Sequence, residues 1–117
     1  MRMELKPALK GLRQSCGALA SAVVSRDGLV ISADVPEGVS METFAIMCAT
    51  LLGAASTANS ELRVGTPQHV LVESEDAKMV VVGAGRKALI VAVVNKRGDH
   101  ELAIKKLDEL AETIKMI

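Results

Sequence analysis

Three small residues in the second half of the chain have the spacing of a dinucleotide-binding loop. Gly83, Gly85 and Ala88 match the pattern G-x-G-x-x-A, and an apolar run precedes them. The acidic residues Asp99 and Glu101 follow at roughly the distance at which a carboxylate would meet a ribose. If a helix began directly after the glycines, its N-terminus could hold a pyrophosphate.

The residues after this loop predict a strand instead of a helix. The segment LIVAVVNK is rich in β-branched side chains and ends at a break over residues 95–98. Only about four residues separate the two apolar runs, which is too few for the crossover of a βαβ unit. We therefore predict that Gly83 and Gly85 form a hairpin turn, and that the chain binds no nucleotide or other cofactor.

Histidines could offer metal binding or catalysis, but their surroundings do not favour either. His69 and His100 are the only two. Only His100 has acidic neighbours. These are Asp99 and Glu101, which are better explained by helix capping than by metal ligation. The sequence contains no nucleophile elbow, phosphate-binding loop, Cys-x-x-Cys or His-Glu-x-x-His motif. We predict no metal site and no enzymatic activity.

The two cysteines, Cys16 and Cys48, each stand among apolar or small residues. This setting is typical of buried thiols in a reducing compartment. A disulfide or a reactive thiol is the alternative interpretation.

Composition excludes several classes of partner. The 117 residues carry 14 basic and 14 acidic side chains, so the electric field that a general nucleic-acid binder uses is absent. Phe44 is the only aromatic residue, so stacking platforms for bases and for most flat cofactors are nearly absent. We predict one domain over residues 1–117. The charged N-terminal segment does not resemble a signal peptide, so we expect a cytoplasmic protein without direct membrane insertion.

The first third of the chain predicts a short helix and a hairpin. Leucines recur at helical spacing from Leu5, and Gly17 follows as a C-terminal cap. Two β-prone runs, Leu19–Ser25 and Leu29–Ala33, flank an Asp-Gly dipeptide, which is a strong hairpin signal. Asp27 could be an acid catalyst, but its place in the turn accounts for it.

The segment Met41–Glu61 predicts the most informative helix. Ser40 precedes it as an N-cap, and no charged residue occurs from Thr43 to Ser60. A helix without a charged face is covered on more than one side. Its second half is nevertheless too polar to span a bilayer. A ridge of small side chains at every fourth position would let another helix approach closely: Ala45, Ala49, Gly53 and Thr57.

Three more strands and a final helix complete the predicted fold. The strands cover Gln68–Ser74, Lys78–Gly83 and Ala88–Val94, and Asp99 caps the helix. The apolar stripe of that helix consists of Ala103, Leu107, Leu110, Ile114 and Ile117. The order α-β-β-α-β-β-β-α predicts an α+β fold, with a five-stranded antiparallel sheet and helices on both faces.

Two of these elements predict a contact with another protein. The strand Gln68–Ser74 contains no Lys or Pro, so if it lies at the edge of the sheet it lacks the usual protection against pairing with another chain. An open edge beside an uncharged helix is typical of a homodimer that uses both. The sequence does not determine which face of the helix Met41–Glu61 meets the partner. The predicted interface comprises Phe44, Ala45, Met47, Ala49, Leu52, Gly53, Ser56, Thr57, Gln68, His69, Val70, Leu71 and Val72.

The element order and the phrase GALASAVVSRDGLVISA, residues 17–33, resemble the roadblock / dynein light-chain family, which includes MglB-type regulators. The resemblance covers essentially the whole chain. It implies a profilin-like architecture and dimers in which the second helices pack together and the third strands form a continuous sheet. It also implies a non-enzymatic scaffold or a regulator of small Ras-like GTPases, with no catalytic residue to carry over.

The leading hypothesis is therefore a dimeric interaction module that binds or regulates a small Ras-like GTPase. A structural adaptor in a larger complex is the alternative, and it differs only in the partner. A small-ligand sensor has less support, because the chain offers neither aromatic residues nor convergent polar groups for a pocket.

Overall fold

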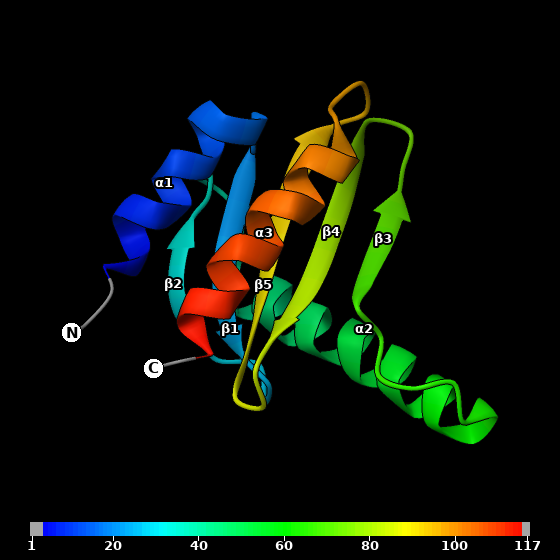
Figure 1. Ribbon diagram of the computed structural model, residues 1–117. Coiled ribbons are helices and arrows are strands. Elements are labelled where there is room, and N and C mark those ends of the chain that lie inside the picture. Colours follow the sequence, from blue (N-terminus) through cyan, green and yellow to red (C-terminus); the bar gives the residue numbers. More distant parts are fainter. Residues whose placement is uncertain (1–3, 116–117) are drawn as a thin grey trace.

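Eight elements follow one another in the predicted order in the computed structural model, which describes residues 4–115 (Figure 1). They are α1 (Leu5–Cys16), β1 (Ala20–Ser25), β2 (Val30–Asp34), α2 (Met41–Leu62), β3 (His69–Glu73), β4 (Ala77–Ala84), β5 (Ala88–Asn95) and α3 (His100–Ile114). The predicted fold class is confirmed, and the ends of the strands and of α2 differ from the predicted ones by at most one residue. Ile117, predicted for the last helix, lies outside the described residues.

The five strands form one antiparallel sheet in the order β2-β1-β5-β4-β3. The third strand, β3, therefore lies at an edge, which is the condition on which the predicted pairing with another chain depends. The opposite edge, β2, is interrupted by a bulge where its pairing shifts between Val23 and Val24 of β1. A bulge twists an edge away from further pairing, whereas β3 pairs with β4 in an unbroken register.

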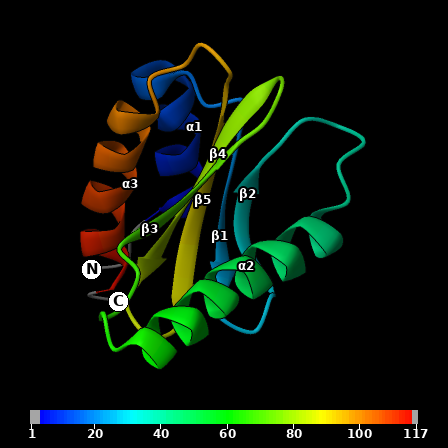
Figure 2. The same ribbon diagram turned by 90° about the vertical axis from the view of Figure 1, so that its right-hand side faces the viewer.

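Helices cover both faces of the sheet (Figures 1 and 2): α1 and α3 pack on one face, and α2 crosses the other. Alternating side chains of each strand therefore enter two separate cores. The core under α1 and α3 includes Leu9, Val80, Ile90 and Leu107. The core under α2 includes Ala45, Leu52, Val81, Leu89 and Val91. The central strand β5 is buried on both sides, which explains its continuous apolar run.

The β1–β2 turn is the Asp-Gly hairpin that the sequence predicted. Gly28 has a φ of +94°, a conformation that side chains disfavour, and its Cα faces α2. A Cβ at this position would lie 3.2 Å from Cα of Ile46. The Ser25 hydroxyl donates to the Asp27 carboxylate and accepts from the N–H of Leu29 at 2.9 Å. Asp27 therefore has the turn role, and the turn fits directly against the helix.

Helix ends follow the predicted caps with one difference. Gly17 ends α1 in the left-handed conformation, and the Asp99 carboxylate accepts the N–H of Leu102 at 3.1 Å. Ser40 occupies the N-cap position of α2, but its hydroxyl donates to Oγ1 of Thr43 at 3.1 Å instead of accepting a backbone N–H. The predicted N-cap position of Ser40 is confirmed, but its side chain makes no capping hydrogen bond to the backbone.

Candidate protein-interaction surface

The helix α2 packs its inner face on the sheet. Ala45 is fully buried, and Cys48 and Leu52 are each 2 % exposed. Their own domain already buries the side chains of Ala45 and Leu52, so the proposed contact with a partner falls on the more exposed residues of the predicted interface. By length and composition α2 could cross a membrane, with a mean hydropathy of 1.3. Its inner face instead belongs to the core of the domain.

The ridge of small residues winds around α2 and does not lie on one face. Ala45 is buried, Ala49 is half-buried, and Gly53 and Thr57 are exposed. Residues four positions apart are rotated by about 40° around a helix, so the ridge turns from the sheet toward solvent in three steps. Gly53 and Thr57 remain available to a partner, and Ala49 lies at the margin of the surface.

The outward face of α2 is free of charge over most of its length. Ile46 and Met47 are 48 % and 55 % exposed, which is unusual for large apolar side chains. The Thr50 hydroxyl donates to the carbonyl of Ile46 at 2.8 Å, so a partner could cover it without leaving its donor unpaired. We define this outward face by its exposed residues Thr43, Ile46, Met47, Thr50, Gly53, Ala54, Thr57 and Ala58.

The margins of this face hold two more predicted interface residues. Phe44 is half-buried and packs against the core under α2. Ser56 is also half-buried, and its hydroxyl donates to the carbonyl of Leu52 at 2.9 Å.

The C-terminal end of α2 extends beyond the edge of the sheet. Its 22 residues span about 33 Å, whereas five strands are about 24 Å across. Figure 1 shows the helix continuing past β3. Leu62 and Val64, at the end of this overhang, are 74 % and 64 % exposed. The sequence reasoning missed both, although two apolar residues around Arg63 at a helix end were the available signal.

The edge strand β3 provides the second part of the surface. Val70, Leu71 and Val72 are half-buried, whereas His69 and Glu73 are exposed. Gln68 lies one residue before the strand. The α2 overhang and the β3 edge lie on the same side of the domain (Figure 1), so the structure brings together the two predicted elements.

Of the glycines of the apparent nucleotide motif, Gly85 lies in the β4–β5 turn with a φ of +71°, and Gly83 lies near the end of β4. The predicted hairpin is confirmed. Nη2 of Arg26 donates to the carbonyl of Gly85 at 2.6 Å and would lie 2.7 Å from a Cβ at Gly83. The arginine thus ties the β1–β2 turn to the β4–β5 turn. Its path across the sheet explains why position 83 lacks a side chain.

An open pocket of about 590 Å³ adjoins this arginine. Arg26, Gln68, and Asp108 and Glu112 of α3 are among the residues that line it. No aromatic residue lines it. Because its lining includes one basic and two acidic side chains, the pocket does not favour a ligand of one charge.

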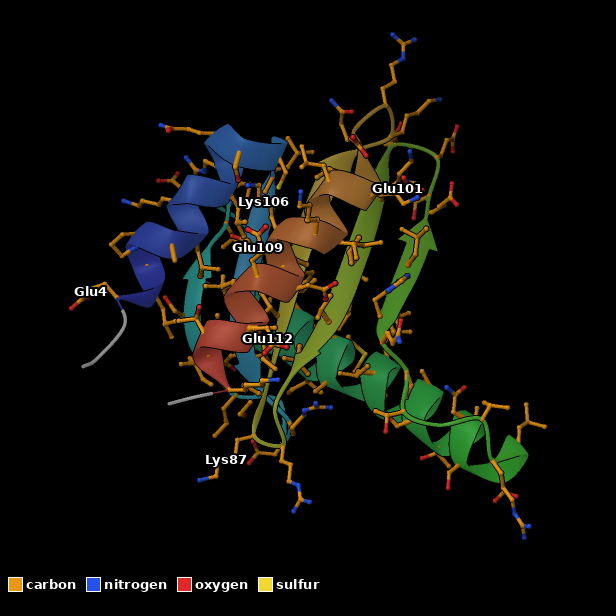
Figure 3. The ribbon with its side chains drawn as sticks, viewed as in Figure 1. Glu4, Lys87, Glu101, Lys106, Glu109 and Glu112 are labelled. Carbon is orange, nitrogen blue, oxygen red and sulfur yellow. The ribbon has the colours of Figure 1, made fainter. Side chains whose placement is uncertain are left out.

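In the described part of the chain, acidic and basic side chains alternate along α3 and also occur at the turns. Figure 3 shows Lys87 at the β4–β5 turn and Glu101 at the far end of the sheet, with Lys106, Glu109 and Glu112 along α3. Within residues 4–115, no group of three or more His, Cys, Asp and Glu residues could hold a metal ion.

Both cysteines are free thiols whose pKa is raised by burial. Burial raises the pKa of Cys48 to about 11. Burial also raises the pKa of Cys16, and the N–H of Ala18 partly offsets this effect. Thiolate is the reactive form, so neither residue has the environment of a nucleophile at neutral pH.

The raised pKa of Cys48 makes stability depend on alkaline pH. Below pH 9 the thiol is protonated in both states, and between about pH 9 and 11 only the unfolded chain loses the proton. Folding stability should therefore fall as pH rises through this window. We expect a smaller fall for Cys48→Ala in urea unfolding at pH 8 to 11. The absence of Tyr simplifies the comparison. Equal slopes for the two proteins would contradict the assignment.

Comparisons with known proteins agree with this architecture. The sequence model of the Roadblock/LC7 domain matches residues 6–95. Two uncharacterised proteins of Methanocaldococcus jannaschii are each 35 % identical over 80 residues, which cover 68 % of this chain and 70 % of each relative.

Solved structures share the fold at low sequence identity. The Roadblock/LC7 domain from Streptomyces avermitilis has a TM-score of 0.89 at 20 % identity, covering 97 % of both chains. Myxococcus xanthus MglB has a TM-score of 0.85 at 14 % identity, covering 97 % of this chain and 96 % of that one. Acanthamoeba castellanii profilin II has a TM-score of 0.67 at 15 % identity, covering 97 % and 98 %. At these identities the likeness shows the fold.

Proposed function

The chain belongs to the Roadblock/LC7 family, and from this membership we propose that it is a non-enzymatic, dimeric interaction module that binds or regulates a small Ras-like GTPase. The observation that carries the proposal is that an open β3 edge lies beside an overhanging helix that has no charged residue from Thr43 to Ser60. Both features are costly for an isolated domain and are useful in a dimer.

Pairing of two β3 strands would join two sheets into one. The overhang of each α2 would then lie beneath the sheet of the other copy, where Leu62 and Val64 could be buried. Their present exposure, 74 % and 64 %, supports this arrangement. The remaining proposed contacts come from Gly53, Thr57 and the strand residues Val70, Leu71 and Val72.

Part of the outward face of α2 would remain accessible in such a dimer. Two copies would present it twice, related by a two-fold axis. A platform of this kind can regulate a GTPase without catalytic residues, by binding one conformation of a switch region more tightly than another. The absence of charged side chains from Thr43 to Ser60 favours a partner that presents an apolar surface.

The proposal is tested with the small Ras-like GTPases encoded in the same genome. Each is loaded with fluorescent GDP, and nucleotide release and GTP hydrolysis are measured with and without this protein. We expect saturable binding at micromolar concentration to at least one GTPase and a several-fold change in one of the two rates. If no such GTPase binds, the proposed function is wrong.

A structural adaptor is the second candidate, since the same surfaces would serve it. Binding to a GTPase with unchanged nucleotide release and hydrolysis would favour this function. The pocket beside Arg26 gives a small-ligand sensor less support, because oppositely charged groups and no aromatic residue line it.

A further inference from the structure

The hydrogen-bonding pattern of β3 determines which backbone groups are free. The N–H of Ser74 donates to the carbonyl of Ala77 at 2.8 Å, so residues 74 and 77 form a hydrogen-bonded pair. Bonded and non-bonded pairs alternate along an antiparallel ladder. Residues 72 and 70 therefore bond to β4 through their partners Met79 and Val81. The N–H and C=O groups of residues 69, 71 and 73 point toward the open edge.

These three residues also share one face of the sheet. Leu71 packs against the core under α1 and α3, whereas Val70 packs against the core under α2. Alternation along the strand places His69 and Glu73 on the same side as Leu71. Both are exposed, and each can meet a residue of an added strand.

A second copy can pair with β3 about a two-fold axis in only a few registers. Directly opposed residues share a face, so the axis passes through Val70, Leu71 or Val72. An axis at Leu71 opposes all three residues with free groups and allows about six hydrogen bonds. An axis at Val70 or Val72 allows about four between strand residues. With the axis at Val70, Glu73 would oppose Pro67 of the other copy, which has no N–H to donate. With the axis at Val72, His69 would oppose residue 75, which lies in the β3–β4 turn.

We infer that two copies pair their β3 strands about Leu71, so that His69 of each copy opposes Glu73 of the other and these two residues favour self-pairing. This inference rests on the proposed dimer. An imidazole N–H can donate to the opposing carboxylate, and the arrangement occurs twice by symmetry. Within one chain, Val82 opposes His69 and Lys78 opposes Glu73. The Lys78 ammonium donates to the carbonyl of Gly98 at 3.2 Å, which leaves Glu73 available.

The first test mixes two variants with altered charge. His69→Glu alone opposes Glu73 with a second carboxylate, and Glu73→Arg alone opposes His69 with a cation. A mixed dimer contains one Glu–Arg pair and one His–Glu pair. Native mass spectrometry of an equimolar mixture should show a roughly tenfold preference for the mixed dimer over the statistical proportion. His69→Glu mixed with Glu75→Arg is the control, because position 75 opposes position 69 only if the axis passes through Val72.

The second test uses cysteine cross-linking. Leu71→Cys places two thiols opposite each other at a Cα separation of about 5.5 Å, within the range of a disulfide. We expect Leu71→Cys to form a disulfide-linked dimer faster than Val70→Cys, Val72→Cys or the natural chain with Cys16 and Cys48. Fastest cross-linking at position 70 or 72 overturns the register.

Light scattering separates this inference from the proposed dimer. A protein of twice 12.3 kDa that shows neither the mixed-dimer preference nor the Leu71→Cys cross-link would overturn the β3 register and leave the dimer intact. A monomer of 12.3 kDa at all concentrations would overturn both.

Discussion

Gly53→Glu is expected to convert the proposed dimer to a monomer at micromolar concentration. Gly53 is exposed on α2, and no atom lies within 4 Å of an added Cβ, so the domain itself can accept the side chain. Replacing a helical glycine also favours the helix by up to about 1 kcal/mol. In the dimer the carboxylate would be buried against an uncharged surface, at a cost of several kcal/mol. The substitution therefore separates association from folding.

Gly11→Glu is the matched control for this experiment. Gly11 lies within α1, is exposed, and likewise has no atom within 4 Å of an added Cβ. Light scattering should give twice 12.3 kDa for the natural chain and for Gly11→Glu, and 12.3 kDa for Gly53→Glu. Circular dichroism should be unchanged in all three. A dimeric Gly53→Glu protein would show that this face of α2 is not the interface. Ala49→Glu is less clean, because Ala49 is half-buried on the sheet.

Leu52→Ala should destabilise the fold by about 2–5 kcal/mol, because it leaves a cavity in the core under α2. Leu52 is 2 % exposed and packs in this core with residues of β1, β4 and β5. The same substitution at Leu62, which is 74 % exposed, removes no core packing within the domain. Leu62→Ala should cost the isolated domain less than about 0.5 kcal/mol, and it should weaken the dimer.

Urea unfolding in the Gly53→Glu background measures both effects on the domain alone. The midpoint should fall strongly for Leu52→Ala and remain nearly constant for Leu62→Ala. Dilution of Leu52→Ala and of Leu62→Ala, each without Gly53→Glu, then gives the concentration at which each dimer dissociates. If Leu52→Ala changed only the dissociation concentration, its place in the core would be incorrect and the sequence-based interface assignment would be restored.

The local elements could be predicted from the sequence because each has a signal within a few residues. The Asp-Gly dipeptide predicted the first hairpin, since Gly28 accepts the positive φ of the turn. The β-branched run after Gly85 distinguished a hairpin from a nucleotide-binding loop. The uncharged stretch from Thr43 to Ser60 indicated a helix covered on more than one side. These features depend on neighbouring residues and need no knowledge of distant ones.

The orientation of α2 could not be predicted in the same way. Its residues are apolar or small all around, so no polar face marks the side that meets the sheet. A spacing of four suggested one ridge, but the ridge winds around the helix by about 40° per step. Ala45 therefore lies in the core while Thr57 lies in solvent.

The sequence by itself determined the element order, the two hairpins and the presence of an unprotected strand, because turn chemistry and hydrophobic period are local properties. Only the tertiary structure decided which side of α2 is free, how far the helix overhangs β3, and that Arg26 ties two turns together. These features depend on the angle at which a helix crosses a sheet and on contacts between residues far apart in the chain. Packing of the whole domain sets both.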